Sequence, residues 1–329
     1  MRTRPTRRAV LAAALAAPIL ARAQSRRALR LIVPFPPGGA VDSLARILGE
    51  RLAPVLDQPV VVDNRSGAGG LIGADAVAKG PPDGTMLGII GAATFGAAPV
   101  LQPSMPFDPR RDLTPVTQIT DSAVVIAVNA RHADERGWHD LPALLAWAKR
   151  NPGTLRIAYA GPATVSHLAL AAMAKLAAVD ITMVPYRGGA HAATDVLAGT
   201  IDGSADLPSP LLPHIETGQM RALAVSSRAR LALAPAIPAF GELAGSPVSE
   251  LDIRSWNMMT LPPGTQDGEI TRLHAAVVRV AGEPSFREAL RPLAYDPVTS
   301  PSPQAAAAMV AAEMPRWRRL VELSGATAG

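Results

Sequence analysis

The sequence contains no cysteine, few aromatic residues and few charged ones. Of its 329 residues, 4% are aromatic and 18% are charged, whereas 48% are hydrophobic. The missing cysteine excludes a disulfide scaffold and any metal or iron–sulfur site that depends on thiolate ligands. The hydrophobic share excludes a disordered polymer. The length therefore fits one large domain or two lobes of roughly 100 to 200 residues each.

The chain also lacks an excess of basic charge once its first 23 residues are set aside. The formal net charge is +5, and those residues contain no acid but hold Arg2, Arg4, Arg7, Arg8 and Arg22. Without these five arginines, 27 basic residues balance 27 acidic ones. Nucleic-acid binding therefore has no electrostatic basis.

The first 23 residues are typical of an export signal. A basic start is followed by an uncharged run over 9–21 and by the small-x-small site Ala21-Arg22-Ala23. That run is short for a membrane span, and it contains Pro18 and is closed by Arg22. We expect cleavage after Ala23 and a mature protein in the periplasm. The segment TRRAVL at 6–11 resembles a twin-arginine box, so the Sec and twin-arginine routes both stay open.

Short apolar runs alternate with amphipathic stretches from Leu29 onward, which predicts an α/β fold with largely parallel strands. We expect strands at 29–33, 60–62, 86–90, 124–128, 156–159, 182–184, 201–206 and 222–225. We expect helices after Asp42 and at 71–79, 140–150, 165–179, 192–197, 269–281 and 304–323. After Arg228 the chain is rich in proline and is interpreted as irregular up to its last helices. This order predicts a first lobe from 24–127, a second lobe from 128–248, and a return to the first lobe with C-terminal helices over 249–329.

Motifs for metal, cofactor or nucleophile chemistry are missing. The six histidines form no His-x-x-x-His pair, and there is no Gly-x-Ser-x-Gly or Walker loop. Gly67-Ala68-Gly69 follows a predicted strand, but a dinucleotide fingerprint would need glycine where Ile72 stands. We therefore expect neither a bound metal nor a cofactor.

Loops of small residues recur between a predicted strand and a predicted helix. They lie at 38–39, 67–70, 161–164 and 188–189. A helix N-terminus presents unpaired N–H groups and a partial positive charge, so it attracts carboxylate or phosphate without a basic side chain. Because open α/β sheets bind ligands at the carboxyl ends of their strands, these loops predict an anion-binding cleft.

At these loops the sequence resembles the periplasmic solute receptors of tripartite tricarboxylate transporters, also called the Bug family. The resemblance rests on RLIVPFPPGGAVD at 30–42, QPVVVDNRSGAGG at 58–70, PDGT at 82–85, PFDP at 106–109, GPATVSHL at 161–168, VPYRG at 184–188, DVLAG at 195–199, RALAV at 221–225, Trp256, and PGT at 263–265. It runs from about Arg30 to Trp317, which is nearly the whole mature chain.

The resemblance implies a two-lobed periplasmic binding protein of the type II-like, Venus flytrap kind, each lobe a mainly parallel sheet flanked by helices. It implies a receptor without enzyme activity that binds a small organic carboxylate, namely a di- or tricarboxylate, an amino acid or an aromatic acid, between its lobes and passes it to integral-membrane transporter subunits. We expect a monomer. The residues that match the family's cleft are Phe35, Pro37, Gly38, Gly39, Asp42, Gly67, Gly69, Gly70, Ala160, Gly161, Thr164, His167, Tyr186, Gly188 and Asp206.

Several of these residues have a second interpretation. Thr164 can cap the following helix, His167 can be a structural hydrogen-bonding group, and Asp42 fits an N-cap. If Asp42 and Asp206 both line the cleft, an amino acid or hydroxy acid is favoured over a bare dicarboxylate. The chain departs from the family pattern at Ser66, Ala163, Ala205 and Asn257, so the specific ligand of another family member cannot be assigned to it.

Two other functions stay open. The protein could be a sensor that presents its closed form to a membrane histidine kinase. It could also be a hydrolase with Ser166 or Thr164 as nucleophile and His167 as base. Neighbouring residues on a helix point about 100° apart, which disfavours a hydrogen bond between Ser166 and His167.

Overall fold

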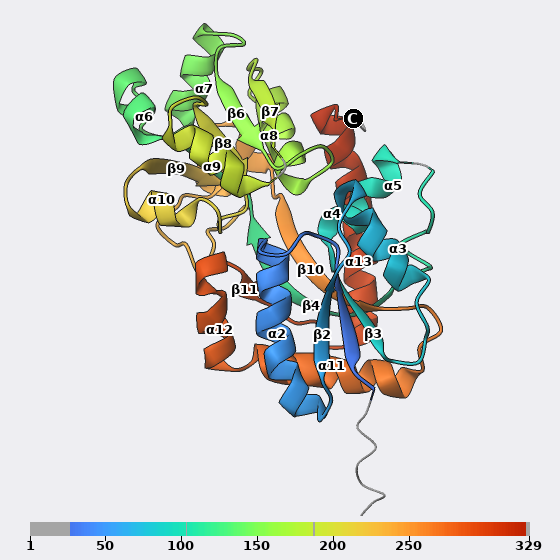
Figure 1. Cartoon of the computed structure of the whole chain (residues 1–329). Helices are drawn as coiled ribbons and strands as arrows, with labels where there is room; N and C mark the ends of the chain where they lie inside the picture. The colour runs from blue at the N-terminus through green and yellow to red at the C-terminus, as the bar shows by residue number, and fades with distance from the viewer. Residues whose placement is uncertain (1–26, 103, 187, 327–329) are drawn as a thin grey trace, which may run out of the picture.

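The computed structural model describes residues 27–102, 104–186 and 188–326. The expected export signal and its cleavage after Ala23 lie outside the described residues. Two lobes lie one above the other, each with its own β-sheet and helices around it (Figure 1). The expected two-lobed α/β fold is confirmed.

The sheet of the first lobe contains six strands among the described residues, in the order β11–β4–β10–β3–β1–β2. β1 pairs in parallel with β2 and β3, whereas β10 pairs antiparallel with β3 and β4, and β11 antiparallel with β4. The strands are β1 (Leu29–Val33), β2 (Val60–Asn64), β3 (Met86–Gly91), β4 (Thr114–Ala123), β10 (Arg254–Leu261) and β11 (Asp296–Pro297).

The sheet of the second lobe has the order β7–β6–β8–β5–β9 in the part of the chain described. β6 pairs in parallel with β7 and β8, and β5 pairs antiparallel with β8 and β9. The strands are β5 (Val125–Asn129), β6 (Arg156–Tyr159), β7 (Thr182–Pro185), β8 (Gly203–Asp206) and β9 (Met220–Val225). Both sheets are therefore mixed, which corrects the expectation of mainly parallel sheets. The strands of successive strand–helix units are parallel, but β10 in the first sheet and β5 in the second run opposite to both of their neighbours.

The helices of the first lobe surround its sheet, and those of the second lobe cover the upper sheet in Figure 1. The first group is α2 (Ala40–Leu56), α3 (Leu71–Ala78), α4 (Ala92–Gly96), α5 (Ala98–Leu101), α11 (Asp267–Ala281), α12 (Pro284–Leu290) and α13 (Pro303–Ser324). The second group is α6 (Ala130–Arg136), α7 (Leu141–Arg150), α8 (Val165–Leu176), α9 (Gly189–Leu197) and α10 (Leu212–Glu216). Short 3-10 turns are η2 (Ala68–Gly70), η3 (Phe240–Glu242), η4 (Pro247–Glu250) and η5 (Arg291–Leu293).

Helix α2 shows how the local pattern becomes structure. Leu44, Leu48 and Leu52 recur at a four-residue spacing and are fully buried against the sheet. Burial of each such side chain contributes about 2 kcal/mol. The helix begins at Ala40 with Gly39 as its N-cap, so the interpretation of Asp42 as the N-cap is wrong. Asp42 lies instead in the first turn, where its charge complements the helix dipole.

The lobes are joined where β4 ends and β5 begins, around Val124. The Ser226 amide donates to the Val124 carbonyl, and the Ser226 hydroxyl donates to the Ile253 carbonyl and accepts from the Val124 amide. Three crossing segments are thus hydrogen-bonded through one buried side chain. The lobe limits at 127/128 and 248/249 stay proposals, and the change of sheet at Val124 favours a slightly earlier first limit.

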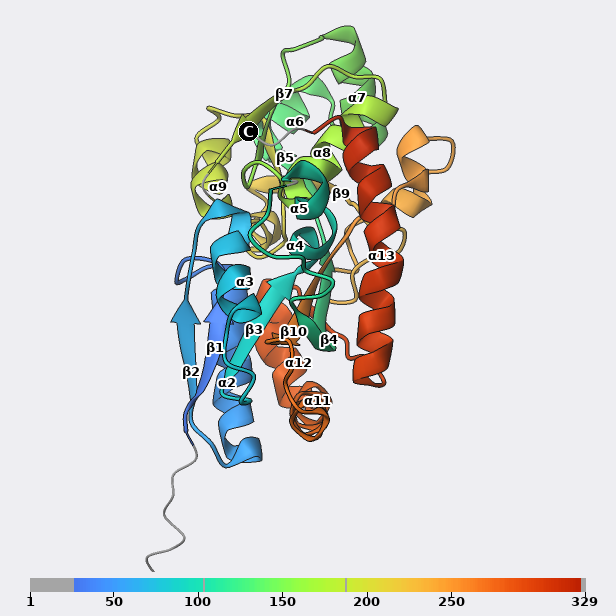
Figure 2. The same cartoon turned by 90° about the vertical axis from the view of Figure 1, so that its right-hand side faces the viewer.

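Helix α13 runs alongside both lobes (Figure 2) and contacts β4 and α4 in the first and α8 in the second. Trp317 of this helix packs against Gly96, where a side chain would overlap the indole ring. The C-terminal part of the chain therefore returns to the first lobe and also reaches the second.

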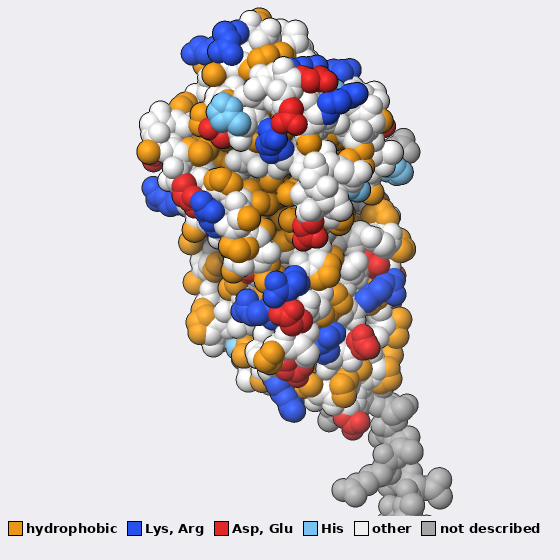
Figure 3. All heavy atoms as spheres, turned by 90° about the vertical axis from the view of Figure 1, so that its left-hand side faces the viewer, with side chains coloured by type: hydrophobic (Ala, Val, Ile, Leu, Met, Phe, Trp, Pro, Cys, Tyr) orange, Lys and Arg blue, Asp and Glu red, His pale blue; other side chains and the backbone are white. Residues whose placement is uncertain are grey.

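The surface carries charges of both signs side by side. On the face shown in Figure 3, Lys and Arg side chains lie among Asp and Glu side chains and form no single basic patch. Within the described residues, no helix combines the length and apolar character needed to cross a bilayer.

Candidate ligand-binding site

The loop between β1 and α2 is held in place by the Asp42 carboxylate. Asp42 is 2% exposed and accepts hydrogen bonds from the Gly38 amide (2.9 Å) and the Asn64 side chain (2.9 Å). It also forms an ion pair with Arg46, with 2.9 Å between Oδ2 and Nε. Asn64 also donates to the Phe35 carbonyl at 3.0 Å. Burial by itself raises the pKa of Asp42, but the hydrogen bonds from Arg46, Gly38 and Asn64 outweigh it and hold this pKa below 3.8. Asp42 thus orients the exposed residues Pro37, Gly38 and Gly39.

The loop after β2 has a backbone that favours glycine. Gly67, Ala68, Gly69 and Gly70 all have positive φ, from 48° at Ala68 to 133° at Gly67. A side chain at Gly70 would contact the Phe35 ring at 3.5 Å, so this loop lies directly against the first one. Two strand ends of the first lobe therefore bring their small-residue loops together.

The facing loop of the second lobe precedes α8. Thr164 is the N-cap: its hydroxyl accepts from the His167 amide at 3.3 Å and donates to the Gly161 carbonyl at 2.7 Å. The Ser166 hydroxyl accepts from the Ala160 amide (3.1 Å), and the His167 ring accepts from the Ala163 amide (3.2 Å). The amides of Ala160 and Ala163 are thus engaged within the loop. The first-turn amides of α8 have no preceding helical carbonyl, as at any helix N-terminus.

His167 has the environment of a structural histidine. Its ring stacks on Tyr159 with 4.8 Å between ring centroids, and burial lowers its pKa below 6.5. The neutral ring can accept from Ala163, which a protonated one cannot. Among the described residues, no hydrogen bond joins this ring to the hydroxyl of Thr164 or Ser166. The arrangement lacks the nucleophile–base contact of a hydrolase.

A cavity of about 390 Å³ lies between the two lobes. The first lobe contributes Ala68, Gly69, Leu71, Ala93, Thr94, Ala98 and Gln102, and the second contributes Pro162 and Ala163. The predicted residue Gly69 lines this cavity, and Gly67, Gly70, Gly161 and Thr164 flank lining residues. The structure therefore places two of the predicted loops, one from each lobe, around a shared space.

The lining also includes residues that sequence reasoning missed. Ala93 and Thr94 in α4, and Ala98 and Gln102 in and after α5, follow β3 at the same edge of the sheet. β3 was expected, and the rule that ligands bind beyond strand carboxyl ends applied to it as well. The segment Ala92-Ala93-Thr94 contains no glycine, which is the residue that marks the other loops.

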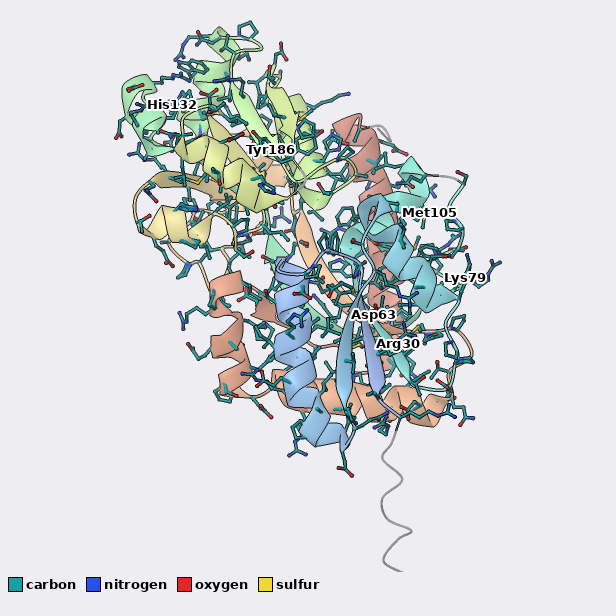
Figure 4. All side chains as sticks on the ribbon, viewed as in Figure 1. Arg30, Asp63, Lys79, Met105, His132 and Tyr186 are labelled. Carbon is teal, nitrogen blue, oxygen red and sulfur yellow. The ribbon has the colours of Figure 1, made fainter. Side chains whose placement is uncertain are left out.

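The other predicted residues do not line this cavity: Phe35, Pro37, Gly38, Gly39, Asp42, Ala160, His167, Tyr186, Gly188 and Asp206. Tyr186 belongs to the second lobe (Figure 4), and its hydroxyl donates to Asp195 at 2.6 Å. Burial and this hydrogen bond raise the pKa of Tyr186 to about 12. The hydroxyl is therefore engaged within its own lobe.

Asp206 is buried at the end of β8, beside the N-terminus of α9. One carboxylate oxygen accepts from the Leu207 amide at 2.7 Å, and the other has no hydrogen-bond partner among the described residues. A side chain at Gly189 would overlap this second oxygen. Burial raises the pKa of Asp206 to about 7, although the Leu207 hydrogen bond opposes the shift.

Another buried carboxylate lies at the outer end of the second lobe, where Figure 4 shows His132. Asp202 is 1% exposed, lies 3.1 Å from His132 Nδ1, and accepts from Arg136 at 2.9 Å. It also accepts from the Arg156 amide at 2.9 Å. Asp202 therefore ties α6 to β6 and β8, away from the cavity.

Comparison with known proteins gives a consistent result. The family model described as tripartite tricarboxylate transporter family receptor matches residues 44–326. Protein BugT of Bordetella pertussis is 34% identical over 318 residues, which cover 96% of this chain and 95% of BugT. The structure of periplasmic binding protein BugD is 28% identical with a TM-score of 0.80, covering 92% of this chain and 99% of BugD. R. palustris Rpa4515 with adipate is 30% identical with a TM-score of 0.82, covering 92% and 98%.

Proposed function

Because the chain belongs to the tripartite tricarboxylate transporter receptor family, we propose that it captures one small organic carboxylate between its lobes and delivers it to the membrane subunits of such a transporter. The family consists of solute-binding receptors rather than enzymes. The protein acts in the periplasm as a monomer after removal of residues 1–23.

The observation that carries this proposal is the cavity between Gly69 of the first lobe and Ala163 of the second. Its volume of about 390 Å³ falls within the usual range for small-molecule sites. Because both lobes contribute to its walls, a ligand there contacts both at once. The adipate named for Rpa4515 supports a small carboxylate as that ligand.

The binding residues we propose are the matching loop residues of both lobes. Gly39 at the start of α2, together with Gly67 and Gly69, receives the carboxylate in the first lobe, while Gly38 and Gly70, whose amides bond to Asp42 and to the Gly67 carbonyl, allow the ligand to approach the backbone. The loop from Ala160 to Thr164 closes over it from the second lobe, with His167 fixing the Ala163 amide. Phe35, Pro37 and Asp42 shape the first loop, and Tyr186, Gly188 and Asp206 complete the second-lobe side.

Closure follows from differential affinity. A ligand shifts the lobes toward the closed form only by binding that form more tightly than the open one. Micromolar binding needs about −8 kcal/mol, which is about −0.8 kcal/mol per atom for roughly ten heavy atoms. That value lies within the ceiling for small ligands, so main-chain amides in a closed cleft suffice.

Calorimetry of the purified protein against a panel of small carboxylates tests the proposal, with Gly69→Asp as the decisive variant. Gly69 has φ +64 and open space around it, so an aspartate fits sterically and places negative charge in the cavity wall. We expect binding to fall at least 100-fold. Gly218→Asp is the matched control, because Gly218 has φ +73, equally open surroundings, and a position remote from the cavity. Equal affinity of the two variants would contradict the assigned site.

The loop at Gly39 is tested separately. A side chain there meets only the Pro36 carbonyl at 3.7 Å, so Gly39→Asp adds charge without a clash. We expect binding to be lost while the melting temperature stays unchanged. Gly268→Asp adds the same charge at the start of α11, where nothing lies within 4 Å. Retained affinity in Gly39→Asp would remove this loop from the site.

Delivery to a transporter requires a test in cells. Deleting the gene for this protein should abolish uptake of the acid that the purified protein binds, and reintroducing the wild-type gene should restore that uptake. Uptake that continues at the original rate in the deletion strain would contradict delivery and favour the sensor interpretation.

A further inference from the structure

The cavity contains two polar side chains that the protein itself leaves unused. Thr94 in α4 is 5% exposed, and Gln102 directly follows α5. In the described part of the chain, neither the Thr94 hydroxyl nor the Gln102 carboxamide has a hydrogen-bond partner, although both residues line the cavity. The Thr94 hydroxyl is not one of the fully buried side-chain atoms that lack a partner, so it is accessible from the cavity, where a ligand can form a hydrogen bond with it.

The rest of the lining is apolar and uncharged. Leu71, Ala93, Ala98 and Pro162 contribute hydrocarbon, and none of the described lining residues carries a charge. One carboxylate can be placed against helix N-termini at the loop ends. At the Thr94 and Gln102 end the described lining offers neutral hydrogen-bonding groups and no cation, so an uncharged polar group, which costs less to dehydrate than a second carboxylate, is favoured there.

Two alanines narrow this space at an energetic cost. Ala68 has φ 48° and Ala163 has φ 60°, which lie in the left-handed region. Glycine is unstrained there, whereas this backbone conformation costs another residue about 1 kcal/mol. Both alanines line the cavity, one from each lobe, and both have glycine neighbours in their loops. Methyl groups at these positions bring apolar surface from opposite sides toward the bound molecule.

We infer that this site, if it binds a carboxylate as proposed above, selects a monocarboxylate with a short apolar body and an uncharged polar group at its far end. Thr94 and Gln102 form hydrogen bonds with that group, which is a carboxamide, carbonyl or hydroxyl. Ala68 and Ala163 contact the apolar body. The side-chain amide of Gln102 both donates and accepts, so it fits a carboxamide or hydroxyl in either orientation.

The test uses sets of three acids that differ only at the far end. At chain lengths of four, five and six carbons, calorimetry compares the diacid, its monoamide and the simple monocarboxylate: succinate, succinamate and butyrate, then the glutarate and adipate sets. At the length that binds most tightly, we expect the monoamide to bind at least 10-fold more tightly than the diacid and than the simple acid.

Variants then assign the preference to residues. Thr94→Val and Gln102→Met should each weaken monoamide binding about 10-fold and change binding of the simple acid less than twofold, because each removes only hydrogen bonds. Gln102→Lys should shift the preference toward the diacid. Gln266→Met, at the exposed N-cap of α11, is the matched control and should change neither.

The outcomes separate the two proposals. A diacid that binds as tightly as its monoamide, or variants that leave the preference intact, would overturn the selectivity while the carboxylate receptor stands. Binding of none of the nine acids, together with no binding in the wider carboxylate panel, would overturn the proposed function itself.

Discussion

The Asp42 carboxylate accepts a hydrogen bond from the Gly38 amide, with 2.9 Å between Oδ2 and N. Through this contact a buried charge on α2 sets the shape of an exposed loop that carries no charge of its own. The side chains of Arg46 and Asn64 complete the arrangement.

We expect Asp42→Asn to destabilise the protein by about 2 kcal/mol, because it removes the charge from three hydrogen-bonded contacts. Urea unfolding at pH 7 measures the change. Asp134→Asn is the control, since Asp134 also pairs with one arginine but is exposed, and should cost less than about 1 kcal/mol. Equal effects of the two substitutions would contradict the bracing role of Asp42.

The same residue predicts a pH dependence. Because the pKa of Asp42 lies below 3.8 in the folded state, its contribution to stability is complete above that value and is lost as pH falls through the folded-state pKa. The difference in unfolding free energy between wild type and Asp42→Asn should therefore be constant from pH 5 to 7 and shrink below pH 4.

Asp206 predicts the opposite trend. Its pKa is raised to about 7, so the folded state favours the protonated acid. The free energy of unfolding should fall by at most about 4 kcal/mol as pH rises from about 4 to about 7, and it should then level off. In Asp206→Asn this pH-dependent contribution should vanish. The free energy of unfolding of the variant should therefore increase relative to that of wild type as pH rises. An unchanged pH profile in the variant would exclude Asp206 as its source.

Ser226→Ala should loosen the connection between the lobes. It removes the hydroxyl that accepts from the Val124 amide and donates to the Ile253 carbonyl, leaving two buried main-chain groups without partners. We expect a loss of about 2 to 3 kcal/mol in urea unfolding. Ser249→Ala removes a single hydroxyl contact, to the Ser246 carbonyl, and serves as the control. A smaller effect at Ser226 than at Ser249 would argue against this role.

Gly96→Ala should destabilise the protein by about 3 kcal/mol, because its methyl group would overlap the Trp317 side chain. Thermal and urea unfolding both report the loss. Gly268→Ala, in a helix with open space, should be neutral or slightly stabilising. If Gly96→Ala folds with wild-type stability, the contact between α4 and α13 is looser than described.

Sequence patterns predicted much of the fold because most elements follow a single period. β1 was predicted over the residues it occupies, and the helix predicted over 140–150 is α7, which begins at Leu141 and whose N-cap Asp140 accepts from the Ala143 amide at 2.7 Å. The long strands β4 and β10 were missed, although both lie inside the first sheet with a neighbour on each side. Their interior positions include the buried residues Thr117, Gln118, Thr120 and Asn257, which only tertiary hydrogen bonds make favourable.

The site was predictable to the same extent. Glycine signals backbone that adopts positive φ or lies close to another group, and this signal pointed to Gly69, which lines the cavity, and to the loop at Gly161, whose neighbours Pro162 and Ala163 line it. It could not find Thr94 or Gln102, whose types are common on any helix. Their relevance comes from their position beside a loop of the other lobe, which no local pattern records.

Helix α13 contacts β4 at one level and α8 at another, so any rotation of one lobe against the other must alter at least one of these contacts. Helix α13 therefore helps to set the angle between the two lobes in the absence of ligand. Substitutions near the C-terminus, far from any bound acid, should change apparent affinity by changing how often the binding-competent form is populated.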